Sequence, residues 1–81
     1  MKYRHHRGGL EDSLKTTIEV GNINDLKAYI NESYAFGDNV EELKFEYIGM
    51  DDRINWDTYM VLMRLKDSDK FMVAGMSDGK L

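Results

Sequence analysis

The segment 56–65 constrains the fold more than any other part of the chain, because it is apolar on both sides of an extended backbone. Its two faces carry Trp56, Thr58, Met60 and Leu62 on one side and Tyr59, Val61, Met63 and Leu65 on the other. A strand that is dry on both faces is usually central in its sheet. The segment therefore requires a neighbouring strand on each side and a covering layer on each face.

Other segments show the periods of regular secondary structure. Alternation of apolar and polar residues predicts strands at 14–20 and 43–47. The segment 71–76 returns as the partner of 56–65 after a turn at 66–69. The chain therefore contains at least four predicted strands.

A helix is predicted between the first two of these strands. Its apolar face is formed at helical spacing by Leu26, Tyr29, Ile30, Ser33 and Tyr34. Asn22 is a good N-cap, and Gly37 is placed to end the helix. The order predicts an α+β fold with one helix packed on a small, mostly antiparallel four-stranded sheet (β-α-β-β-β). Because one helix covers one face, the face that carries Met60 needs the N-terminal segment or a second subunit to cover it.

The net charge of −4 is distributed unevenly along the chain. Residues 1–9 contain three basic residues and no acidic residue, which leaves eight basic and fifteen acidic residues in 10–81, a net of −7. The acidic residues are densest in 38–52. Gly8 and Gly9 would let the basic segment hinge against the rest. We therefore predict a basic N-terminal arm at residues 1–9 and a single α+β domain at residues 10–81.

The predicted arm offers basic and aromatic side chains, namely Tyr3, Arg4, His6 and Arg7. Such residues reach phosphate backbones in nucleic-acid-binding proteins. However, an arm of seven residues on an acidic body makes a weak electrostatic footprint, so nucleic acid is not an expected partner. We favour docking of the arm on the chain's own acidic surface at 38–52, because opposite charges on one molecule attract each other.

The densest polar cluster lies in the loop 49–55. Two carboxylates in a loop suit a basic partner or a divalent cation, but their spacing does not match an EF-hand, and no metal site is predicted. The alternative is a solvated turn in which aspartates accept backbone N–H bonds and Arg53 pairs with one of them. The candidate partner-binding residues are Asp51, Asp52, Arg53, Asn55, Trp56, Asp57, Glu41 and Glu42.

Recognisable catalytic motifs are missing from the sequence. It has no Cys, no G-x-S-x-G elbow, no G-x-G-x-x-G and no P-loop pattern. A chain of 81 residues rarely builds the water-excluding cleft that paired carboxylates need. We therefore expect no enzymatic activity and no cofactor. No stretch reaches the roughly 18 apolar residues of a membrane helix and no signal peptide is recognisable, which predicts a cytoplasmic protein without membrane contact.

Two stretches of the chain resemble a family of small phage and prophage proteins. These begin with a Tyr-Arg-x-His-Arg-Gly-x-Leu run and continue with an acidic loop, Arg, Trp-Asp-Thr-Tyr and a Gly-containing last strand. The matching positions, over about half of the chain, are Tyr3, Arg4, His6, Arg7, Gly8, Leu10, Asp51, Asp52, Arg53, Trp56, Asp57, Thr58, Tyr59 and Gly75. One departure is His5, where the family pattern has Pro, which would fix φ. The resemblance implies an origin in a bacterial mobile genetic element rather than a mechanism.

The expected function is that of a small phage- or prophage-type, non-enzymatic protein-interaction module. Its acidic surface would inhibit or modulate a bacterial host protein, or bind a phage protein, in the cytoplasm of the host cell. One alternative is a phage structural or assembly component that acts through homo-oligomer contacts, with a homodimer as the simplest case. Self-association would also stabilise so small a domain. The other alternative is small-ligand or metal binding at residues 49–57.

Overall fold

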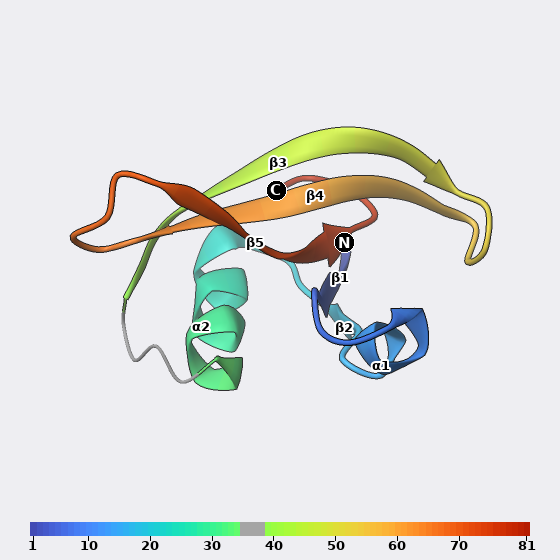
Figure 1. Cartoon of the computed structure of the whole chain (residues 1–81), viewed down its shortest axis with the longest axis horizontal. Helices are drawn as coiled ribbons and strands as arrows, with labels where there is room; N and C mark the ends of the chain where they lie inside the picture. The colour runs from blue at the N-terminus through green and yellow to red at the C-terminus, as the bar shows by residue number, and fades with distance from the viewer. Residues whose placement is uncertain (35–38) are drawn as a thin grey trace.

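In a computed structural model, which describes residues 1–34 and 39–81, an antiparallel sheet curves over two helices (Figure 1). Both helices lie on the concave side of the arch that the longest hairpin makes. The elements in chain order are β1 (Lys2–His5), α1 (Leu10–Leu14), β2 (Ile18–Glu19), α2 (Ile23–Ser33), β3 (Val40–Asp51), β4 (Trp56–Leu65) and β5 (Phe71–Ser77).

The five strands form one sheet in the order β2-β1-β5-β4-β3, and every neighbouring pair is antiparallel. The predicted α+β class with an antiparallel sheet is confirmed. The prediction of four strands and one helix is wrong, because the structure has five strands and two helices. β4 has the predicted bounds and lies between β5 and β3. That interior position explains its apolar pattern, and Val61 and Met63 belong to the core.

The fifth strand comes from the predicted N-terminal arm. β1 is inserted between β2 and β5, so the prediction of an arm outside the domain is wrong for residues 2–5. Tyr3 is fully buried and His5 is 1% exposed. The strand therefore extends the sheet and does not dock as an arm on 38–52. Arg4, between these two residues, lies in register with Met76 and Met60 across the sheet. The basic composition concealed an alternation in which the two aromatic rings point into the core.

The segment 14–20, predicted as the first strand, is extended only at β2. Leu14 ends α1, and a turn follows it. Side-chain contacts outweigh the alternating pattern here: the Ser13 hydroxyl accepts Nη1 of Arg4 at 2.6 Å and donates to the carbonyl of His5 at 2.5 Å. A five-residue helix would be marginal alone, so these contacts with β1 stabilise it.

α2 begins where the sequence predicts. The Asn22 side chain accepts the backbone N–H of Asp25 at 2.8 Å, which is the geometry of an N-cap. The predicted apolar face is confirmed at Leu26 and Ile30, which are fully buried. Gly37, the predicted end of the helix, lies outside the described residues.

β1 and β5 pack very closely at Gly75. A Cβ atom at this position would lie 2.7 Å from both Cε1 and the hydroxyl oxygen of Tyr3, and it would collide with the carbonyl oxygen of Arg4. Contacts that short do not occur between real side chains, so the position requires glycine. Because Gly75 has no side chain, β1 and the ring of Tyr3 can lie directly against β5.

His5 is the centre of a buried aromatic cluster beneath β1. Its ring stacks on Tyr29 with centroids 4.7 Å apart and meets Tyr3 and Tyr34 edge to face. The Tyr3 hydroxyl lies 3.0 Å from Nδ1, and Nε2 is buried without a hydrogen-bond partner in the described chain. Burial, and then the charge of Arg7, lowers the pKa of His5 to about 4. The ring is therefore neutral at pH 7.

β3 is much longer than predicted. The sequence predicts a strand at 43–47 and a loop from Gly49, whereas the strand continues to Asp51. A bulge between Tyr47 and Gly49 allows the continuation, with φ of 108° at the glycine. The turn to β4 is short and contains Asn55 at a φ of 58°. The result is a long hairpin that projects beyond the helices (Figure 1).

Candidate functional site

β3 is the exposed edge of the sheet. It pairs with β4 on one side only, and the opposite edge is the two-residue β2. α2 closes the beginning of the β3 edge: Asn31 Oδ1 accepts the N–H of Val40 at 3.1 Å, and Lys27 Nζ donates to the carbonyl of Glu41 at 2.8 Å. From Glu42 onward, no strand of the described chain pairs with this side of β3. Such an edge presents a row of unpaired N–H and C=O groups.

Apolar side chains gather along the same edge strand. Five large hydrophobic side chains of the described residues are exposed, and three of them lie in β3: Tyr47 at 59%, Ile48 at 52% and Met50 at 53%. Tyr47 meets Tyr59 of β4 with ring centroids 5.2 Å apart, and a hydrogen bond to Asp57 raises its pKa. A long edge that also carries exposed apolar groups is a template for pairing with another chain.

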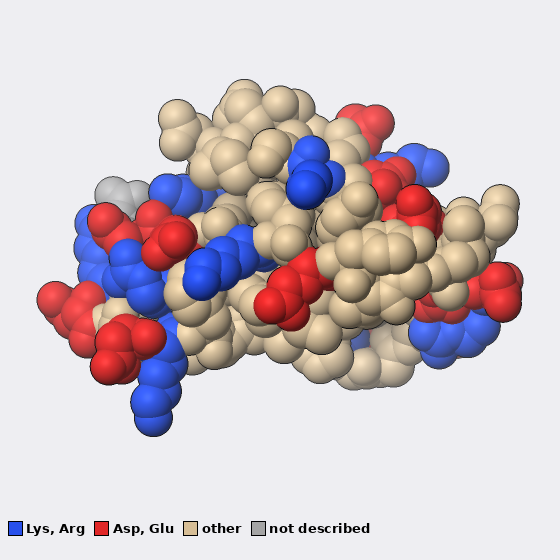
Figure 2. All heavy atoms as spheres, turned by 90° about the horizontal axis from the view of Figure 1, so that it is seen from above, with Lys and Arg blue, Asp and Glu red and all other residues tan. Residues whose placement is uncertain are grey.

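β3 also carries an excess of negative charge. Its charged residues are Glu41, Glu42, Glu46 and Asp51 against Lys44. Two of them have partners on other strands: Glu42 Oε1 lies 3.3 Å from Nε of Arg64 in β4, and Lys44 Nζ lies 4.1 Å from the centre of the Phe71 ring in β5. Figure 2 shows acidic and basic side chains interspersed towards both ends of the molecule, with uncharged atoms over much of the middle. Asp38, counted with the acidic segment, lies outside the described residues.

At the tip of the β3–β4 hairpin, Asp51 and Arg53 form a closed pair. The carboxylate of Asp51 accepts Nη2, Nε and the backbone N–H of Arg53 at 2.7, 2.9 and 3.1 Å. These hydrogen bonds lower the pKa of Asp51 to about 2 and raise the pKa of Arg53. This is the geometry of the solvated-turn alternative. Among the described residues, no group of three or more Asp, Glu or His side chains is placed to hold a metal ion.

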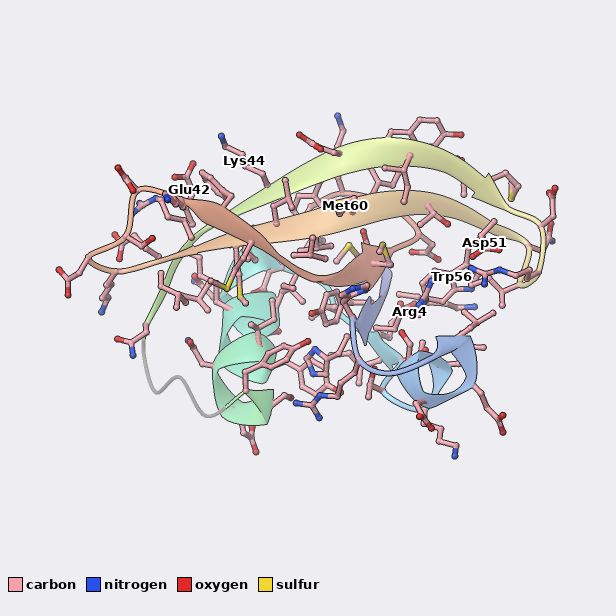
Figure 3. All side chains as sticks on the ribbon, viewed as in Figure 1. Arg4, Glu42, Lys44, Asp51, Trp56 and Met60 are labelled. Atoms are coloured by element: carbon pink, nitrogen blue, oxygen red, sulfur yellow. The ribbon has the colours of Figure 1, made fainter. Side chains whose placement is uncertain are left out.

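The other predicted partner-binding residues are spread along the hairpin. Asp52 and Asn55 are exposed in the turn, and Trp56 is half-buried. Glu42 lies about 30 Å along the strand from Asp51, because each residue of a strand adds about 3.4 Å. Figure 3 shows this separation, with Glu42 at one end of the hairpin and Trp56 and Asp51 near the other. The predicted residues therefore do not form one compact site.

The polar residues of the predicted arm differ in exposure but line a common cavity. Arg4 is only 6% exposed, whereas His6 and Arg7 are exposed in the loop that follows the strand. All three line one cavity together with Arg53 from the hairpin tip. The predicted docking of the arm on 38–52 did not include Arg53, and nothing in the spacing of these residues indicates that β1 lies inside the sheet.

The β3 edge was also missed, although one signal for it exists. Apolar residues continue past the predicted end of the strand at Ile48 and Met50, on either side of Gly49. A single glycine inside an apolar run can mark a bulge rather than a loop. Recognising the bulge would have lengthened the strand to the size of its partner.

No protein-family model, curated protein or solved structure matches the chain. No helix of the described residues has the length and apolar character needed to cross a membrane. The resemblance to phage and prophage proteins therefore stays a prediction, and the function has to be argued from the β3 edge and the residues around it.

Proposed function

We propose that the chain is a non-enzymatic protein-interaction module whose docking element is the free edge of β3 from Glu42 to Asp51. The observation that carries the proposal is a long strand whose outer edge has no strand partner in the described chain and which exposes Tyr47, Ile48 and Met50. A partner that adds a strand there hydrogen-bonds to the free backbone groups, while side chains on alternate positions provide specificity.

The charge of β3 selects the chemistry of the partner. Four acidic residues against one lysine favour an extended segment that carries Lys or Arg. Opposite charges directly across a strand pair each stabilise it by about 0.2–1 kcal/mol, so several of them discriminate between partners. The resemblance implies a phage or prophage origin. On that basis the proposed partner is a bacterial host protein, which the chain inhibits or modulates in the cytoplasm of the host cell.

The test is affinity capture from bacterial extract with three immobilised forms of the chain. I48K/M50K places two lysines on the edge, which blocks addition of a basic strand. M72K is the matched control, because Met72 is a similarly exposed methionine at 47% but lies in β5, two strands away from the β3 edge. We expect the wild type and M72K to retain the same protein, and I48K/M50K to lose it.

Cross-linking from Lys44 then locates the bound segment. Linkage of Lys44 to an extended, basic segment of the retained protein supports strand addition. Retention of the same protein by I48K/M50K at wild-type level contradicts it, as does a cross-link pattern that avoids β3. Capture of nothing by the wild type contradicts a host partner in that extract.

Self-association through the same edge is a second candidate. Antiparallel pairing of two β3 strands about a two-fold axis at Phe45 places Lys44 of one copy opposite Glu46 of the other, and symmetry repeats this pair. The observation against it is the net negative charge that each β3 brings. A homodimer of this kind would use the edge that the proposal assigns to a partner.

Sedimentation equilibrium over a wide concentration range tests this second candidate. K44E and E46K should each weaken a dimer by placing like charges opposite each other, and K44E/E46K should restore it. A chain that stays monomeric at all concentrations excludes the dimer and leaves the edge to a different protein. Dimerisation that is insensitive to these substitutions places the contact elsewhere.

A further inference from the structure

A cavity of about 170 Å³ lies between the loop that follows β1 and the tip of the β3–β4 hairpin. Its lining includes three arginines from two distant parts of the sequence. The residues that matter to its chemistry are Arg4, His6, Arg7, Gly9, Ser13 and Arg53. Near this end of the hairpin, Figure 3 shows Arg4 close to Trp56.

Arg4 is held rigidly and yet incompletely satisfied. It is 94% buried, and its guanidinium stands over the Trp56 ring at 5.5 Å from the ring centre. Nη1 donates to Ser13 Oγ at 2.6 Å, which is the only hydrogen bond of this guanidinium within the described chain. Nε is buried without a partner, and no carboxylate of residues 1–34 or 39–81 forms an ion pair with the group.

A buried cation without a counter-ion is costly, because burial penalises the charged form. That burial lowers the pKa of Arg4, while the charge of Asp51 raises it. Asp51 is nevertheless committed to Arg53 through three hydrogen bonds. Asp51 therefore offsets only part of the positive charge around the cavity. Asp12 lies beside Gly8 in the cavity wall, but its carboxylate is paired with Lys15 at 3.8 Å.

Arg7 is likewise not neutralised by a carboxylate in the described residues. Its Nη2 donates to the backbone carbonyl of Ser33 at 2.8 Å, and its guanidinium lies 4.9 Å from the centre of the Tyr34 ring. A carbonyl oxygen and an aromatic face orient a guanidinium but leave its charge in place. Arg4 and Arg7 thus bring two positive charges without an ion-pair partner in the described residues to one cavity, with Arg53 as a third arginine.

We propose that this cavity binds a phosphate group, either as inorganic phosphate or at the end of a small phosphate monoester. Guanidinium groups match phosphate oxygens with paired N–H donors, and several of them converging on one anion is the usual mode of phosphate recognition. The Ser13 anchor and the Trp56 ring hold Arg4 in place before the ligand arrives, so little side-chain freedom is lost on binding.

The size of the cavity limits the ligand. Sites that enclose drug-sized molecules measure about 300–1,000 Å³, well above the 170 Å³ available here. The space accommodates an anion with a few waters, and the rest of a phosphate monoester would remain outside. Strand addition at the β3 edge does not require this site, so the two proposals stand independently.

Titration with inorganic phosphate and, separately, with glycerol 3-phosphate tests the site. Trp56, the single tryptophan of the chain, lies against Arg4, so its fluorescence reports binding; calorimetry gives a second readout. Sodium chloride at equal ionic strength controls for screening. We expect a saturable response to phosphate that chloride does not produce. Tighter binding of glycerol 3-phosphate than of phosphate would identify a monoester as the natural source.

The variants avoid Arg4, because replacing a buried side chain can unfold the domain. R7Q and R53Q remove exposed guanidinium groups from the cavity, and each should weaken phosphate binding by about tenfold or more, the value of a hydrogen bond to a charged group. R64Q is the matched control, since Arg64 pairs with Glu42 outside the cavity and its loss changes the net charge equally.

The proposal fails if the wild type shows no saturable response to either phosphate compound. It also fails if R64Q weakens binding as much as R7Q and R53Q do, because general charge would then explain the effect. Thermal unfolding of each variant confirms that the fold is intact, so that lost binding is assigned to the cavity.

Discussion

β1 and β3 are opposites in what their sequences suggest and in where the fold places them. β1 is four residues long and basic, but it pairs with β2 and β5 and buries Tyr3 and His5. β3 is twelve residues long and partly alternating, yet it pairs only with β4 and exposes most of its second half. Burial of a strand in this small sheet follows from its neighbours more than from its own composition. The segment predicted as an arm is part of the sheet, whereas β3 keeps one edge without a strand partner in the described chain.

Deletion of residues 1–7 is the strongest test of this contrast. The deletion removes β1, two buried aromatic side chains and both hydrogen-bonded partners that Ser13 has in this segment. We expect loss of the cooperative thermal transition and of most secondary structure, measured by circular dichroism, because a domain of this size has little stability to spare. A truncated chain that melts like the full one would restore the interpretation of residues 1–9 as an arm.

Gly75→Ala should have the next largest effect. The new Cβ would meet the ring and hydroxyl of Tyr3 and the Arg4 carbonyl, so β1 has to move away from β5. Overpacking of this kind costs about 1–3 kcal/mol, and we expect the upper end of this range because one of the contacts is with backbone. The control is Gly21→Ala, where nothing lies within 4 Å of the added atom. Urea unfolding of the two variants gives the difference, and equal stability would show that the β1–β5 seam is not tightly packed.

His5 makes the same seam sensitive to acid. Its pKa in the folded chain is about 4 against an ordinary value of 6.5, so the unfolded chain takes up the proton first as the pH falls. The contribution of neutral His5 to the free energy of unfolding is complete above pH 6.5 and is lost progressively towards pH 4. A depression of this size corresponds to about 3 kcal/mol in all. Unfolding free energies measured between pH 7 and pH 4 should show this decline.

Two variants separate His5 from the other acid-sensitive groups. H5F keeps an aromatic ring in the cluster but has no proton to gain, so its stability should change less over this pH range. H6Q removes the neighbouring exposed histidine and should keep the wild-type decline. Asp51 acts lower, since its depressed pKa of about 2 contributes stability that disappears only as the pH falls below about 4. A wild-type decline retained in H5F would assign the effect to another group.

The sequence is informative where a segment meets its partners close along the chain. The bounds of β4, the N-cap at Asn22 and the turn before β5 depend on local patterns, and they could be predicted. Local patterns could not show that the strand predicted at 14–20 begins as a helix. Its helical start depends on Ser13 contacting Arg4 and His5, and those contacts exist only once β1 is in the sheet.

The candidate sites show the same limit. The contacts at the hairpin tip join residues close in sequence, so a pair between Arg53 and one of the aspartates could be predicted as one alternative. The cavity joins Arg4 and Arg7 to Arg53 across more than forty residues, and the free edge exists because no later strand pairs with β3. Both features are properties of the topology, which periodicity and composition do not specify.

The smallest expected effect on stability is that of the lysine substitutions on the β3 edge. Ile48 and Met50 are slightly more than half exposed, and Met72 is slightly less than half exposed. The free energies of unfolding of I48K/M50K and of M72K should therefore each lie within about 0.5 kcal/mol of the wild-type value. Urea unfolding measures this directly. A large loss in I48K/M50K alone would mean that the edge packs against the rest of the domain and is not free for a partner. Equal stability, combined with lost capture, places the role of β3 in binding and that of β1 in folding.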